Sequence, residues 1–231
     1  MSSDLTSFIK EGSLKIRKNN DKFMVFTNIP VHIKDPLPNN IDILKVLGEV
    51  ENKIPARLTN EIDGFYIGFF KEFEERNINA MYRDGAIFIT NDQDNNDDMI
   101  DDLIHEIAHA VEDLHAEFIY SDSRIQNEFI GKRIRFRDML REYGYLDGYE
   151  NLNFEELEYD AELDDYLYKK LGYEKLETFT NGLFITPYAT IGVREYFATA
   201  FEECLLKDHS YVKKISPMVY RKIEKLLKRE V

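Results

Sequence analysis

The 231-residue sequence has no tryptophan, only one cysteine (Cys204), and fewer basic than acidic residues. A single cysteine cannot form an intrachain disulfide, and it excludes a metal site built from paired cysteines. The 44 Asp and Glu residues outnumber the 30 Lys and Arg residues, which gives a formal net charge of -14. Phosphate binding needs clustered basic side chains, so this balance argues against a nucleic-acid partner.

Long apolar runs are also missing from the chain. No stretch of the length that crosses a bilayer is free of charged residues. The N-terminus lacks the basic start and apolar run of a classical signal peptide. We therefore expect a soluble protein with no membrane span, which is cytoplasmic or is released or delivered by a non-classical route.

The first half of the chain contains short β-favouring runs and one helical pattern. Residues 1–20 are polar without a clear period, and we expect an N-terminal arm there, followed by a single catalytic domain over 21–231. Within this domain we predict a strand at 23–27, an amphipathic helix at 41–53 that Pro55 ends, and a buried strand at 65–70.

A β-hairpin is predicted next, because Asp84-Gly85 stands between the apolar runs 80–83 and 86–90. A type I′ turn needs positive φ at both central residues, and Asp-Gly is a strong signal for it. The following acidic segment, 91–98, has two interpretations. A calcium loop of the EF-hand type would need Gly and Glu where Asp97 and Leu103 stand, so we favour a turn and a helix start with Asn96 as N-cap.

The helix predicted at 97–120 carries the chemistry of the chain. It reads His105-Glu106-Ile107-Ala108-His109, with apolar residues at helical spacing on its other faces. Residues four apart on a helix lie one above the other, so His105 and His109 can bind one ion. Zn²⁺ accepts imidazole nitrogen well, and Glu106 is placed to take a proton from water beside the ion. The HExxH pattern therefore predicts a zinc site.

The second half of the chain is predicted to be mainly helical. We expect helices over 121–142, over 191–206, and over a last segment with Ser216 as N-cap and Pro217 in its first turn. After Gly172 we expect a polar turn region. The cluster of Lys132, Arg133, Arg135 and Arg137 favours a solvated helix face over recognition of an acidic partner.

An acidic block without Lys or Arg lies between Glu142 and Tyr168. It either keeps a loop and a helix in solution or, beside a cleft, attracts basic substrate segments. We favour the first interpretation.

A zinc site needs a third protein ligand. Among the other histidines, His115 lies on another face of the same helix, His209 is expected at a helix end, and His32 precedes the motif. Glu158 and Glu162 are possible ligands on an acidic helical segment. Glu195 is better placed because it stands on an otherwise apolar helix, where burying a carboxylate is costly unless it is paired or binds a metal.

At these residues the chain resembles the zinc peptidase domain of anthrax lethal factor and the Pro-Pro endopeptidases. The family's second motif, a Tyr followed at fixed spacing by E-[FY]-F-A-x-A-F, matches Tyr188 and the run from Glu195 to Phe201. The resemblance covers roughly residues 80–230. Ala108 stands where the family usually has Gly, and Thr199 where an acidic residue is common. The interval between the two motifs also looks longer, with an insertion at about 143–183.

The resemblance implies an α+β, zincin-like fold, with a small N-terminal antiparallel or mixed sheet packed on a mainly helical C-terminal part. It implies a gluzincin-like zinc endopeptidase whose metal ligands are His105, His109 and Glu195. Glu106 is then the general base, and Tyr188 stabilises the oxyanion, unless it is one more packed aromatic among fourteen tyrosines. The expected partner is a protein or peptide substrate, which the strand at 86–90 could bind as an edge strand.

Two other functions use the same residues. A non-catalytic structural or interaction protein, such as a particle component or an effector module, could retain the zinc scaffold without turnover. Intact Glu106 and Tyr188 argue against this alternative, because a site kept only for folding needs no base. Hydrolysis of a non-peptide amide would need the same ligands and base.

Overall fold

A computed structural model describes residues 23–228, so the arm expected at 1–20 lies outside the described residues. The chain divides into two compact units, Met1–Leu114 and His115–Val231. The α+β class is confirmed, since the first unit contains a five-stranded mixed sheet and the described part of the second is mainly helical. Within residues 23–228, no helix is long and apolar enough to span a membrane.

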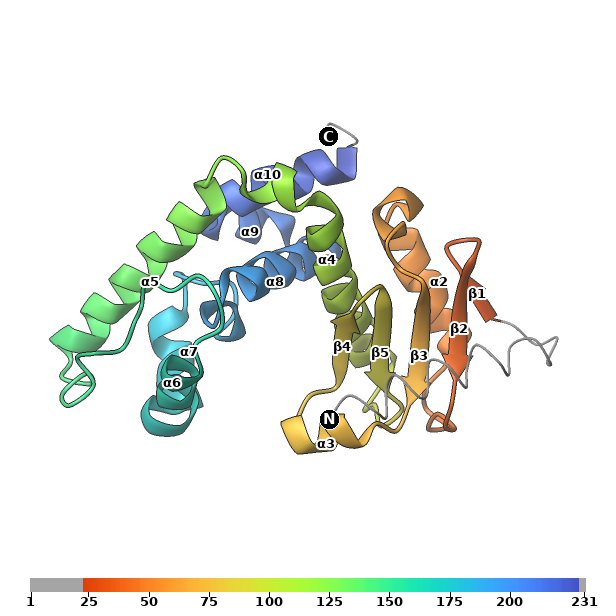
Figure 1. The fold of residues 1–231 in the computed structure, drawn as a ribbon, viewed down its shortest axis with the longest axis horizontal. Helices are drawn as coiled ribbons and strands as arrows, with labels where there is room; N and C mark the ends of the chain where they lie inside the picture. Colours follow the sequence, from red (N-terminus) through yellow and green to blue (C-terminus); the bar gives the residue numbers. More distant parts are fainter. Residues whose placement is uncertain (1–22, 229–231) are drawn as a thin grey trace. The chain divides into compact units, whose positions relative to one another are not determined.

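The sheet has the strand order β1-β2-β3-β5-β4, which can be followed in Figure 1. Its strands are β1 (Phe23–Val25), β2 (Ile29–Ile33), β3 (Gly64–Gly68), β4 (Ala80–Arg83) and β5 (Ala86–Thr90). The two outer pairs are antiparallel, whereas β3 is parallel to both β2 and β5. The prediction that 86–90 forms an edge strand is therefore wrong. Strand β3 pairs with all of β5, and β4 forms the edge instead.

The strand predicted at 23–27 is shorter than expected. It ends at Val25, because Phe26 and Thr27 take positive φ values of 50° and 76° and reverse the chain into β2. Sequence analysis missed β2, which contains Pro30 paired with Met24. Proline lacks a backbone N–H and usually ends a strand, so the sequence pattern does not indicate a strand there.

Two helices connect the strands of the first unit. The helix predicted at 41–53 is confirmed as α2 (Ile43–Lys53), whose N-cap Asp42 accepts a hydrogen bond from the backbone of Lys45. After it come a short 3₁₀ turn, η1 (Ala56–Thr59), and strand β3. The strand predicted at 65–70 ends at Gly68, since the chain then enters α3 (Lys71–Arg76), a short helix that was not predicted.

The predicted hairpin is confirmed. Asp84 and Gly85 have φ values of 50° and 80°, as a type I′ turn requires. A side chain at Gly85 would also collide, because its Cβ would lie 2.9 Å from a carboxylate oxygen of Asp63. Two independent constraints thus favour glycine at this turn.

The predicted motif helix is confirmed as α4 (Asn96–Tyr120). Its N-cap is Asn95, not Asn96 as predicted, because the Asn95 side-chain oxygen accepts hydrogen bonds from the backbone N–H groups of Asp97 at 2.8 Å and Asp98 at 3.0 Å. The Asn96 side chain instead accepts a hydrogen bond from the backbone of Asp42, at 2.8 Å. This contact joins the start of α4 to the start of α2.

Helix α4 is interrupted at His115, whose φ and ψ of -117° and 20° are not helical. The second unit begins at this residue. In the first unit, the helix buries an apolar surface made of Met99, Ile100, Leu103, Ile104, Ile107, Ala108, Ala110 and Val111. The predicted helical period therefore does position the two histidines on a largely buried helix.

The described part of the second unit contains helices α5 (Arg124–Glu142), α6 (Ala161–Asp165), α7 (Tyr173–Thr180), α8 (Val193–Leu206), α9 (His209–Ile215) and α10 (Pro217–Lys228), with a π-helical segment η2 (Tyr166–Leu171) and a 3₁₀ turn η3 (Tyr188–Thr190) (Figure 1). The predicted helices at 121–142 and 191–206 and the last helix are confirmed. The polar turn region expected after Gly172 is wrong, because α7 occupies it, and α9 was not predicted. Helices α5, α8 and α10 pack against one another.

Two basic residues of α5 are buried, so the predicted solvated face is wrong for Lys132 and Arg133. The Lys132 ammonium donates hydrogen bonds to the backbone oxygens of Leu183 and Ile215, at 2.7 and 2.8 Å, and to the hydroxyl of Ser216, at 3.0 Å. Burial lowers the pKa of Lys132 to about 8, although the nearby charge of Glu128 opposes the shift. The lysine links α5 to the segment after α7 and to the C-terminal end of α9.

Glu128, one turn earlier on α5, caps α10. Its carboxylate accepts hydrogen bonds from the backbone N–H groups of Met218 at 3.0 Å and Val219 at 3.4 Å, and from the hydroxyl of Tyr196 at 2.9 Å. A carboxylate is favourable at the positive end of a helix dipole. Ser216 precedes α10 as predicted, yet its hydroxyl accepts from Lys132 and the carboxylate cap comes from another helix.

Replacing Lys132 with methionine should destabilise the protein, because three buried oxygens lose their donor. We expect K132M to lower the free energy of unfolding by about 2–3 kcal/mol, as measured by urea denaturation. Arg135 is an exposed cation on the same helix, so the matched variant R135M should change this free energy by less than about 0.5 kcal/mol. Equal stabilities of the two variants would contradict the structural role of Lys132.

Candidate metal centre

The two histidines of the motif lie together on α4. Their ring centroids are 5.1 Å apart and their planes are nearly perpendicular, at 77°. Both residues are partly buried, between the apolar surface of the helix and solvent. Two imidazoles four residues apart are thus held by one rigid helix, as the HExxH pattern predicts.

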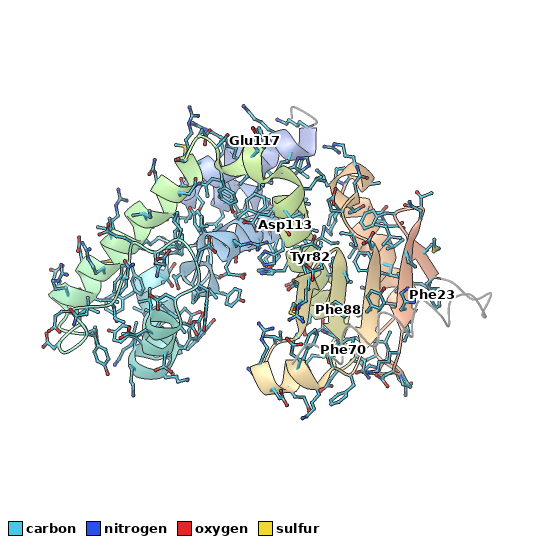
Figure 2. All side chains as sticks on the ribbon, viewed as in Figure 1. Phe23, Phe70, Tyr82, Phe88, Asp113 and Glu117 are labelled. Carbon is cyan, nitrogen blue, oxygen red and sulfur yellow. The ribbon has the colours of Figure 1, made fainter. Side chains whose placement is uncertain are left out.

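Glu106 is buried, with 9% of its surface exposed, and it contacts the edge strand of the sheet. Its carboxylate accepts a hydrogen bond from the backbone N–H of Tyr82 on β4, at 2.5 Å. Figure 2 labels Tyr82 on this strand. Arg83 and Ala86 flank the two-residue turn as a hydrogen-bonded pair, so the preceding residue, Tyr82, directs its backbone groups away from β5. The candidate base is therefore bound to the outer edge of the sheet.

Glu195 lies in the first turn of α8 and is partly buried. The start of this helix is held by the segment before α6, because the backbone N–H of Val193 donates to the carbonyl of Leu157 at 2.8 Å. The positive end of the helix dipole stabilises a carboxylate at this position. This setting offsets part of the cost of partly burying the Glu195 charge.

His105 and His109 of the first unit and Glu195 of the second are the group of side chains that could hold a metal ion. Two imidazole nitrogens and a carboxylate oxygen are a donor set that fits Zn²⁺ and leaves a fourth position open. The alternative ligands Glu158 and Glu162 are exposed and belong to no such group within residues 23–228.

The remaining histidines lie elsewhere and belong to no metal-binding group of the described residues. His32 lies on β2, where its ring stacks on Tyr66 with centroids 4.7 Å apart. His115 occupies the non-helical position of α4, and His209 is the first residue of α9. His209 therefore lies at a helix end, as predicted.

Tyr188 opens the short turn η3 and is 45% exposed. Sequence analysis missed a second tyrosine near Glu195, the partly buried Tyr168 of η2. Burial raises the pKa of Tyr168 far above its ordinary value, and the nearby charges of Asp164, Tyr173 and Glu195 add to the shift. Tyr168 therefore lies within electrostatic reach of Glu195.

Sequence analysis also missed Glu112, three residues after His109 on α4. Its side chain is 3% exposed, and its Oε2 lies 3.4 Å from Nδ1 of His109. Helical spacing could have identified this pair, because residues three apart are neighbours on a helix. In metal centres, the ring nitrogen of a histidine ligand that does not bind the metal is commonly hydrogen-bonded to a carboxylate.

No protein family model, curated protein or solved structure matches the chain. The interpretation of the site consequently rests on the residues described above.

Proposed function

We propose that this protein is a zinc-dependent endopeptidase, in which His105, His109 and Glu195 hold the ion and Glu106 is the general base. The donor set of this group supports zinc. A buried glutamate next to one of the histidine ligands supports hydrolysis, because a scaffold that only binds metal has no need of it.

The observation that carries the proposal is the hydrogen bond between Glu106 and the backbone of Tyr82. It joins the candidate base to an edge strand, and an edge strand can bind an extended peptide through backbone hydrogen bonds. A peptide added along β4 would pass close to Glu106 and to the helix that carries His105 and His109. This arrangement favours a polypeptide substrate over a small amide.

Each residue then has a defined task. Zn²⁺, when bound by the three ligands, supplies a Lewis acid that polarises the scissile carbonyl and lowers the pKa of water. Glu106 accepts the proton of the attacking water and passes it to the leaving amine. Tyr188 donates a hydrogen bond to the carbonyl oxygen as it gains negative charge.

Replacing Glu106 with glutamine tests both the function and the base. The wild-type protein should cleave members of a peptide mixture, detected by mass spectrometry, and a chelator should stop the cleavage. We expect E106Q to retain zinc by elemental analysis but to lose activity by about 10²- to 10⁴-fold, because the amide cannot accept the proton.

The matched control is E117Q, since Glu117 is an exposed glutamate of the same helix, labelled in Figure 2. This variant should keep both zinc and activity. Full activity of E106Q would contradict the assignment of the base. Zinc binding by the wild-type protein without cleavage of any peptide would instead favour the non-catalytic alternative.

Replacing Glu195 with alanine should release the metal, because only two protein ligands remain. We expect the zinc content to fall from about one ion per chain to an undetectable level after dialysis. The variants E158A and E162A should keep their zinc, since these exposed carboxylates lie outside the candidate group. Zinc loss in either of these variants, with retention in E195A, would reassign the third ligand.

Replacing Tyr188 with phenylalanine should slow turnover without loss of metal, because it removes one donor to the developing oxyanion. We expect kcat to fall by about 10²-fold while the zinc content is unchanged. Tyr143 is also exposed, and Y143F is a matched control that should keep wild-type kcat. Equal kcat values for Y188F and Y143F would show that Tyr188 has no role in catalysis.

A further inference from the structure

Helix α4 carries an acidic side chain for which the proposed peptidase mechanism has no task. Glu112 follows His109 by three residues, and both side chains lie within the first compact unit. Only 3% of the Glu112 side chain and 12% of the His109 side chain are exposed. An ionised carboxylate is costly to bury unless it is paired, and the side chain that Glu112 contacts is that of His109.

The contact between the two side chains determines which imidazole nitrogen can bind a metal. Glu112 Oε2 lies 3.4 Å from Nδ1 of His109. An ionised carboxylate can only accept hydrogen bonds, so a bond between these atoms requires the proton of the neutral imidazole to be on Nδ1. The lone pair is then on Nε2, which becomes the nitrogen available for Zn²⁺.

The contact between Glu112 and His109 also affects how strongly the histidine binds a metal. A hydrogen bond to a buried carboxylate fixes the rotation of the imidazole ring and makes its other nitrogen a stronger donor. The negative charge of Glu112 additionally favours a cation nearby, and low solvent exposure limits the screening of this attraction. Each effect acts through His109, because Glu112 is not a member of the ligand group itself.

We propose that Glu112 is a positioning residue of the metal centre, which holds His109 with its Nδ1 protonated and its Nε2 directed to the ion. The inference rests on the proposed zinc site. It is independent of peptide cleavage, because the same positioning would operate in a protein that binds zinc without turnover.

Zinc affinity is the direct test, measured by competition with a chromophoric chelator. We expect E112L, which removes both charge and acceptor, to bind zinc about 10- to 100-fold more weakly than the wild-type protein. E112Q should lose less affinity, because its amide oxygen still accepts from Nδ1. Asp113 is the exposed acidic neighbour, labelled on α4 in Figure 2, and D113N should bind zinc like the wild-type protein.

The tautomer of His109 provides a second measurement that needs no substitution at Glu112. Nitrogen NMR of the zinc-free wild-type protein, with the His109 signals assigned from the H109A variant, should show a proton on Nδ1. A proton on Nε2 would overturn the proposal even if E112L failed to fold. An undisturbed circular dichroism spectrum of zinc-free E112L would show that weaker binding is not a consequence of unfolding.

The outcomes separate this inference from the proposed function. Equal zinc affinities of the wild-type protein, E112L and D113N would overturn the role of Glu112 and leave the zinc site intact. Absence of zinc binding by the wild-type protein would overturn the zinc site and the positioning role together. Weakened binding in E112L, partial recovery in E112Q and an Nδ1 proton would support the proposal, whether or not peptides are cleaved.

Discussion

The period of a single helix is the constraint on which the site depends. Because α4 buries an apolar surface, each polar side chain buried among these apolar residues must have a partner or carry a cost. His105 and His109 recur at the spacing that aligns them, while Glu106 and Glu112 are buried beside them. Each of these carboxylates has a partner: Glu106 accepts a hydrogen bond from the backbone N–H of Tyr82, and Glu112 lies 3.4 Å from Nδ1 of His109.

Local signals in the sequence predicted the features that depend on neighbouring residues. The Asp84-Gly85 turn and the helical period of α4 are such signals, and both are confirmed. Predictions of strand position and side-chain burial were wrong where these features depend on residues far away in the sequence. Strand β5 lies inside the sheet because β3 pairs with it. Lys132 is buried because residues far along the chain, after α7 and at the end of α9, supply its acceptors.

The candidate site likewise contains residues that a local motif predicts and residues that no local motif predicts. The motif identified His105, Glu106 and His109 without help from the fold, because all three lie on one helix. Glu195 depended on a second motif, and its role as the third ligand stays a prediction, as do zinc binding and catalysis. Tyr168 and Glu112 were missed because no motif includes them. Their proximity to a ligand became apparent only from side-chain positions.

The hydrogen bond between Glu106 and Tyr82 has a consequence for the behaviour of the protein in solution. An exposed sheet edge offers unpaired backbone groups to other chains and is a common starting point for aggregation. Strand β4 is only four residues long, and the outward N–H of Tyr82 is already bonded to a side chain of the same molecule. A strand that adds to this edge, from a substrate or from another molecule, therefore has to pair with the outward backbone groups of β4 that remain.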